Sequence, residues 1–379
     1  MHGPELLNWM NQRRETMLAD LATLVSYESP SRDKAVLDPY ATMLAGRFEA
    51  LGGDVNLIEN RVGGNHLDAR FDFQQVAPPA LILAHFDTVW PLGTVVDRPF
   101  RIEGPCAYGP GSYDMKASII LLEAALAALQ ALGLSPRRPI HILITSDEEI
   151  GSPTSRSLIE AAARECAHAL VLEPPLPGGV LKTARKGVGG FTIEIEGKAA
   201  HAGVEPEKGI SAINELALQI PRINALANPT VGTTINVGRI EGGTTPNVVP
   251  AHAMARVDVR VATMDEAQRI EEAFRGLQAI TPGASIQVSG GINRPPMERT
   301  PASRELFAKT QQIGRSLGLE LEEGSTGGGS DGNFTAALGV ATLDGLGMPG
   351  AGAHAINEHI LIESLPERAA LLACLLLEL

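Results

Sequence analysis

The sequence has few cysteines, no long apolar run and a deficit of basic residues. Its three cysteines, Cys106, Cys166 and Cys374, lie far apart and form no C-x-x-C pair, so we expect reduced thiols in a reducing compartment. No run of about 18 apolar residues occurs, and we therefore expect no membrane span. No basic segment leads into an apolar one at the start of the chain, which predicts a cytoplasmic protein without a signal peptide.

Acidic residues outnumber basic ones by 44 to 31, which gives a formal net charge of −13. Nucleic acids and anionic membranes both require a basic face, so we expect neither as a partner. Hydrophobic residues make up 44% of the chain, which is typical of a globular protein. The length of 379 residues favours two domains or one large domain.

The first half of the chain alternates helix and strand patterns. Residues 80–84 and 139–145 are continuous apolar runs, which are typical of strands buried on both faces of a sheet. Helical patterns cover residues 5–27, 34–51 and 115–133. A further helix is expected at 152–165 and a further strand at 168–172. This alternation indicates an α/β domain with helices covering a largely parallel sheet.

The pattern changes near Lys186. Between residues 188 and 289 the expected order is strand, helix, strand, strand, helix and strand, which matches a ferredoxin-like α+β sandwich. Helix and loop patterns return after Pro295. We therefore expect an α/β domain formed by residues 1–185 and 294–379, interrupted by a smaller inserted domain at 186–293.

Five short segments place metal-binding side chains at strand ends or in glycine-rich loops. Alone, each segment also fits an ordinary turn or helix cap. Together they collect where ligands usually bind, at the carboxyl ends of strands in one sheet. Mixed imidazole and carboxylate ligation suits zinc, with Co²⁺ or Mn²⁺ as substitutes. The side chains are His85 with Asp87, Asp114, Glu148 with Glu149, Glu173, and His354.

His85 and Asp87 are two positions apart at the end of a predicted strand. Such positions share a face, so Asp87 can accept the ring N–H of His85 that does not bind metal. A hydrogen bond of this kind fixes the tautomer of a metal-binding histidine.

These segments resemble the co-catalytic dizinc family that includes bacterial glutamate carboxypeptidases, acetylornithine deacetylase, succinyl-diaminopimelate desuccinylase, peptidase T and aminoacylases. The resemblance covers essentially the whole chain and is greatest for the glutamate carboxypeptidase (carboxypeptidase G) group. One departure is that Lys116 is followed by Ala117-Ser118, where the family often has two glycines. The matching motifs are His85–Val89, Gly109–Lys116, Thr145–Ser152, Glu173-Pro174, Gly197–Gly203, Pro246–Pro250, Val257–Arg260, Gly327–Gly332 and His354.

The resemblance implies a zinc-peptidase α/β catalytic domain with a ferredoxin-like dimerisation domain inserted into it. It also implies two Zn²⁺ ions per chain. Asp114 would bridge the two ions, His85 and Glu173 would complete one site, and Glu149 and His354 would complete the other.

Further roles follow from the same resemblance. Glu148 would be the general base, Asp87 would orient His85, and the peptide bond between Asp114 and Met115 is expected to be cis. His201, in the inserted domain, would stabilise the oxyanion.

In dimeric relatives the histidine corresponding to His201 comes from the partner chain. We therefore expect a homodimer with His201 and Asn247 offered in trans, although His201 by itself also fits a surface turn. Arg260 and Arg294 are candidates to hold a substrate carboxylate, or they are ordinary charges. The glycine-rich loop that contains Gly328, Gly329 and Ser330 can offer backbone N–H groups.

The expected reaction is hydrolysis of an amide or peptide bond in a small N-acyl amino acid or peptide. The expected product is a C-terminal amino acid, Glu or Asp. An N-acyl-amino-acid deacylase or a dipeptidase with another side-chain preference is the alternative. A metal-free binding protein on the same fold would lack a ligand or the base, yet all are present. A serine hydrolase is disfavoured because no G-x-S-x-G elbow lies in the right context.

Overall fold

The computed structural model describes residues 2–379, which divide into two compact units. Of these residues, unit 1 comprises 2–184, Arg299–Thr326 and Ser330–Leu379. Unit 2 comprises Arg185–Glu298 together with Gly327–Gly329. Within residues 2–379, no helix is both long and apolar enough to cross a membrane.

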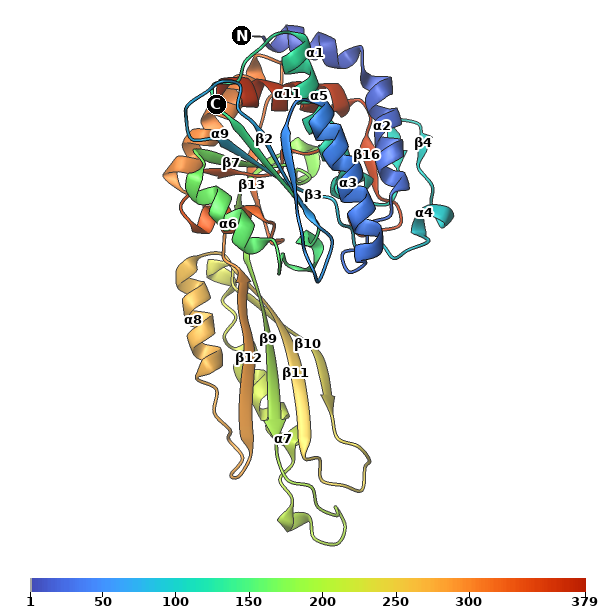
Figure 1. Cartoon of the computed structure of the whole chain (residues 1–379). Helices are drawn as coiled ribbons and strands as arrows, with labels where there is room; N and C mark the ends of the chain where they lie inside the picture. Colours follow the sequence, from blue (N-terminus) through green and yellow to red (C-terminus); the bar gives the residue numbers. More distant parts are fainter. Residues whose placement is uncertain (1) are drawn as a thin grey trace. The chain divides into compact units, whose positions relative to one another are not determined.

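The centre of unit 1 is a six-stranded sheet with the order β1-β2-β6-β3-β7-β14 (Figure 1). Strands β6, β3, β7 and β14 run parallel, whereas β1 and β2 are antiparallel to their neighbours. Every residue of β3 and β6 is buried, as their continuous apolar sequences predicted. The strands are β1 (Asp54–Ile58), β2 (His66–Phe71), β3 (Ala80–His85), β6 (Ile140–Thr145), β7 (His168–Val171) and β14 (Thr342–Leu343).

Helices cover both faces of this sheet. The larger core packs side chains of α1, α2, α3, α5, α9 and α11 with one face, and a smaller core packs α6 and α10 on the other. One further short helix is α4 (Thr94–Asp97). The packed helices are α1 (Gly3–Asn11), α2 (Arg14–Ser26), α3 (Lys34–Ala50), α5 (Ala117–Ala131), α6 (Arg156–Glu165), α9 (Pro301–Arg315), α10 (Gly332–Ala337) and α11 (Ser364–Glu378).

Two predicted helices were wrong in their extent. The helix expected at residues 5–27 is broken after Asn11, and both Leu6 of α1 and Leu21 of α2 are fully buried on either side of the break. The helix expected from residue 152 begins only at Arg156, because the Asp147 carboxylate accepts hydrogen bonds from the residues just before it.

Two further small sheets, whose strands have two to five residues, were not predicted. In the order β15-β16-β5-β4, antiparallel pairing places residues 359–361 beside residues 106–108, and residues 350–351 beside residues 359–360. This pairing brings the loop that carries His354 next to the segment that leads to Asp114. The strands are β4 (Arg101–Glu103), β5 (Cys106–Tyr108), β15 (Gly350–Ala351) and β16 (His359–Leu361), with β8 (Leu181–Arg185) and β13 (Glu323–Thr326) forming the second small sheet.

Unit 2 has the predicted ferredoxin-like order of elements. Its four-stranded sheet has the order β10-β11-β9-β12 with every neighbouring pair antiparallel. Alternate residues of β9 and β11 are buried, and they form a separate core with α7 and α8. The elements are β9 (Gly187–Glu196), α7 (Ala212–Asn224), β10 (Thr234–Gly242), β11 (His252–Val261), α8 (Met264–Arg275) and β12 (Ser285–Arg294).

The core of unit 2 contains a stacked aromatic pair whose contribution to the stability of unit 2 can be measured. The rings of Phe191 and Phe274 lie 4.0 Å apart at 3°. Phe274→Ala should lower the free energy of unfolding of unit 2 by about 3–5 kcal/mol, because it leaves a cavity. Calorimetry should show the loss, while Met264→Ala, at a position 49% exposed on the same helix, should change little. Equal stability of the two variants would contradict this packing.

Candidate metal centre

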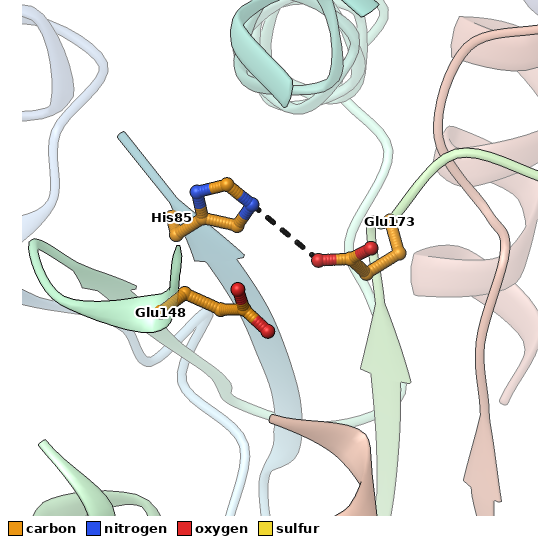
Figure 2. Close-up of side chains that lie close together, drawn as sticks. All are labelled: His85, Glu148 and Glu173. Carbon is orange, nitrogen blue, oxygen red and sulfur yellow. Dashed lines mark ion pairs between the residues drawn. The ribbon is translucent and has the colours of Figure 1, made fainter. Parts of the chain in front are cut away.

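Three parallel strands of unit 1 end at the candidate centre. His85 is the last residue of β3, Glu173 follows β7, and Glu148 follows β6, so neighbouring strands deliver all three to one edge of the sheet. The Nε2 atom of His85 lies 3.4 Å from Oε1 of Glu173. Figure 2 shows the Glu148 side chain extending toward the space between His85 and Glu173. Ligand atoms of the three residues lie within 4.8 Å of one another.

The Asp114 carboxylate lies between two imidazoles. Its Oδ1 is 3.2 Å from Nε2 of His85, and its Oδ2 is 3.6 Å from Nε2 of His354. The same His354 nitrogen is 3.0 Å from Oε2 of Glu149. Each imidazole therefore has a carboxylate of its own and shares Asp114 with the other. The peptide bond between Asp114 and Met115 is cis, as the resemblance predicted.

Asp87 supports the centre in two ways, of which the sequence suggested one. The Nδ1 atom of His85 lies 3.0 Å from the backbone carbonyl oxygen of Asp87 and 3.4 Å from its carboxylate Oδ1. The carbonyl is thus the nearer partner that orients the ring. The two carboxylate oxygens accept the backbone N–H groups of Glu148 and Glu149, each at 3.2 Å. Asp87 therefore also holds the short turn that carries the predicted base.

The surroundings favour positive charge at both imidazoles. Burial alone lowers the pKa of His85, but its hydrogen bonds to Asp114, Asp87 and Glu173 outweigh burial and raise that pKa well above the usual value. Hydrogen bonds to Asp114 and Glu149 raise the pKa of His354 to about 10. Burial raises the pKa of Glu149 to about 7, because its negative charge is poorly solvated there.

The donor set fits a pair of divalent cations. Carboxylates that crowd around two imidazoles repel one another unless positive charge lies among them, and Asp114, Glu149 and Glu173 each lie within 3.6 Å of an imidazole nitrogen here. His85 is 2% exposed and Asp114 14%, whereas His354 is 52% exposed. The centre is therefore anchored in the core and open to solvent on one side. Two imidazoles with three carboxylates match the ligands that zinc, cobalt and manganese accept.

Asp147 is a supporting residue that the sequence did not single out. It precedes Glu148 and Glu149, and its carboxylate accepts hydrogen bonds from the backbone N–H and hydroxyl of both Thr154 and Ser155, at 2.5–3.3 Å. These bonds close the loop that carries the two glutamates. Only its neighbours Glu148 and Glu149 were predicted to be site residues.

Two predicted residues of unit 2 lie next to each other. His201 pairs with Val248 as an isolated bridge, and the Asn247 carbonyl accepts the N–H of Ala202 at 2.9 Å. The Nδ1 atom of His201 accepts the N–H of Gly203 at 3.1 Å. The proton of a neutral His201 ring is therefore on Nε2, which can act as a donor.

The predicted carboxylate-binding residues differ in their surroundings. Arg260 directs Nε and Nη2 to the two carboxylate oxygens of Asp258, at 3.0 and 2.9 Å, so its guanidinium already holds a carboxylate. Arg294 is 5% exposed. Gly329 lies so close that a Cβ there would be 2.8 Å from Cδ of Arg294, and Gly328 accepts a hydrogen bond from Arg185. Unit 2 thus brings Arg294 together with this part of the glycine loop.

Ser330 belongs to unit 1 and is fully buried. Its hydroxyl donates to Oδ2 of Asp344 at 2.6 Å and accepts the N–H of Gly332, while its own N–H bonds to Asn333. These contacts make its side chain a support of the loop.

The comparisons with known proteins identify the family. Residues 81–378 match peptidase family M20/M25/M40. The chain is 32% identical to carboxypeptidase G2 of Pseudomonas sp. (strain RS-16) over 309 residues, which cover 79% of this chain and 73% of that one. It is 27% identical to succinyl-diaminopimelate desuccinylase of Acidovorax ebreus over 368 residues, covering 89% and 91% of the two chains.

Solved structures show the same fold. The aminopeptidase PepT of Bacillus cereus superposes with a TM-score of 0.77 at 22% identity, covering 96% of this chain and 98% of that one. A protein of Bacillus subtilis, described as a dinuclear metal-binding peptidase, superposes with a TM-score of 0.70 at 16% identity over 97% and 98% of the two chains. The chain therefore belongs to peptidase family M20/M25/M40 and is a metallohydrolase with an α/β catalytic domain and an inserted ferredoxin-like domain.

Proposed function

We propose that this protein is a two-zinc hydrolase that releases a C-terminal Glu or Asp from an N-acyl or peptide substrate. The observation that carries the proposal is the Asp114 carboxylate, whose two oxygens face the Nε2 atoms of His85 and His354. The similarity to carboxypeptidase G2 and the motifs shared with glutamate carboxypeptidases support this type of substrate.

The proposed ligands divide into two sets that share Asp114. His85 and Glu173 would hold one ion, and Glu149 and His354 would hold the other. When bound, the two cations supply Lewis acidity at the substrate carbonyl and at the attacking water. Co²⁺ or Mn²⁺ could take the place of zinc.

Glu148 performs the proton transfers in this proposal. Its carboxylate accepts a proton from the attacking water and returns it to the leaving amine, which requires only hydrogen-bond reach of both. The bond between the Asp87 carboxylate and the Glu148 N–H fixes the backbone at that position. Nε2–H of His201 supplies a donor for the oxyanion that forms on the substrate.

Recognition of the substrate's free carboxylate is assigned to unit 2. Arg294, with Gly328 and Gly329 close to it, is one proposed contact. Arg260 is the other, and it would have to exchange Asp258 for the substrate carboxylate. Asn247 lies beside His201 and would contact the substrate next to the reacting amide.

A panel of N-acylated Glu, Asp, Leu, Phe and Arg tests the substrate class. We expect kcat/KM to be highest for Glu or Asp, because the similarity to carboxypeptidase G2 and the motifs shared with glutamate carboxypeptidases favour an acidic residue at the released end. The similarity to succinyl-diaminopimelate desuccinylase favours the alternative, an N-acyl-amino-acid deacylase or a dipeptidase with another preference. Absence of any preference for acidic residues would select the alternative.

We further propose a homodimer in which His201 acts on the centre of the partner chain. Mixing a Glu148→Gln chain with a His201→Ala chain should then restore part of the activity, because one of the two centres in a mixed dimer has both residues intact. The measurement is activity after the two inactive variants are dissociated and reassociated together. Each variant reassociated alone is the control, and a mixture no more active than these controls would show that His201 acts within its own chain.

A further inference from the structure

Glu358 has a buried carboxylate that neither the sequence motifs nor the proposed ligand set uses. It is 2% exposed, yet four N–H groups donate to it. Its Oε1 accepts the backbone N–H groups of Tyr113 and Asp114, each at 3.0 Å. Its Oε2 accepts the backbone N–H of Gly111 and the indole N–H of Trp90, each at 2.8 Å. This single carboxylate therefore accepts hydrogen bonds from four N–H groups that water would otherwise have to satisfy.

The four donors lie on segments that carry proposed metal ligands. Three of them belong to the turn that ends in Asp114, and Trp90 follows shortly after His85 in the chain. Glu358 itself lies in the loop of His354, and its carbonyl accepts the N–H of Gly109 at 3.4 Å. One residue thus joins the segments of three ligands that are far apart in the sequence.

The chemistry of the contact requires a carboxylate. All four partners are donors, so both oxygens must accept, and a glutamine would oppose two of the N–H groups with its own NH₂. Bonds to an ionised acceptor are also stronger than neutral ones. Leaving two donors without an acceptor in a buried position is unfavourable, and the turn that carries Asp114 would move to relieve it.

We propose that Glu358 is a positioning residue that fixes Asp114 relative to His354 and thereby sets the metal affinity of the site formed by Glu149 and His354. This inference rests on the proposed two-metal function. The His85 segment receives only the indole bond, and His85 is anchored separately by Asp87. The site completed by Glu173 should therefore depend much less on Glu358.

The test is a titration of metal-free full-length protein with zinc against a chromophoric chelator, together with metal analysis after dialysis. For Glu358→Gln we expect the weaker of the two zinc affinities to fall by about 10–100-fold, the usual effect of losing a residue that supports a metal ligand. Zinc content after dialysis should fall from two ions toward one per chain.

Two further variants separate positioning from folding. Glu358→Asp keeps the charge but shortens the side chain, so it should show the same selective loss and decides the question if the glutamine variant does not fold. Trp90→Phe removes one bond to the same carboxylate without touching the Asp114 turn, and it should keep both zinc affinities. Glu363→Gln, at an exposed position nearby, is the matched control and should behave like the unmodified protein.

The outcomes are distinct for this inference and for the proposed function. Unmodified protein that binds no zinc contradicts the proposed function and this inference with it. If the unmodified protein binds two zinc ions, equal affinities in the Glu358 variants overturn the positioning role alone. A loss of both ions by the same factor also overturns it, because that result indicates a general structural effect.

Discussion

Replacing Glu148 with glutamine should lower kcat by about 10²–10⁴-fold, the contribution typical of a general acid–base group, while both metals stay bound. The amide cannot accept a proton, yet it has nearly the shape of the carboxylate and its backbone N–H still reaches Asp87. Steady-state kinetics and metal analysis on the same sample measure the two quantities.

The metal analysis matters because Glu148 also lies within 4.8 Å of His85 and Glu173. If Glu148→Gln loses an ion together with activity, Glu148 is a ligand and another group must be the base. Glu165→Gln, at an exposed position of α6, is the control for the loss of one carboxylate. Turnover at the unmodified rate would remove the assignment of Glu148 as the base.

Asp114→Asn should have the second large effect. A bridging carboxylate offers one anionic oxygen to each ion, and here each oxygen already faces an imidazole of a different ligand pair. An asparagine keeps only one good ligand oxygen and leaves more positive charge uncompensated. Because losing a residue that only supports a ligand costs about 10–100-fold in affinity or activity, loss of the shared ligand should exceed that range.

Metal content and kcat/KM of Asp114→Asn are the measurements, and Asp97→Asn at an exposed position is the control. We expect fewer than two ions per chain in Asp114→Asn and two in the control. Two tightly bound ions in Asp114→Asn would show that Asp114 is not shared between them.

The predictable parts of the fold were those whose pattern is local. Strands β3 and β6 are continuous apolar runs because helices cover both faces of the sheet, and unit 2 shows alternation because one face of its sheet packs on helices. Strands β14 and β15 have two residues each, and only their pairing partners define them. Such pairing leaves no periodic signal in the sequence.

The residues of the candidate centre likewise divide into those with a local sequence signal and those whose role depends on the fold. His85, Asp114 and His354 stand in short motifs, so their chemistry could be proposed from the sequence. Glu358 follows no motif used in that reasoning, and its importance comes from donors that the fold brings to it. The contact of His85 with the Asp87 backbone carbonyl was likewise hidden, since every residue has a carbonyl.

The net charge of −13 does not exclude an acidic substrate, because part of this negative charge is gathered at the candidate metal centre. Asp114, Glu149 and Glu173 are part of that charge and are gathered where two divalent cations would outweigh them locally. An anionic substrate could then bind a protein that is acidic as a whole.

The most direct measurement is the metal content of full-length protein purified without chelator, combined with hydrolysis of an N-acyl amino acid before and after metal removal. We predict two zinc ions per chain, loss of activity when they are removed, and recovery with added Zn²⁺ or Co²⁺. Protein that contains no metal, and that gains neither bound metal nor activity from added zinc or cobalt, would contradict the account.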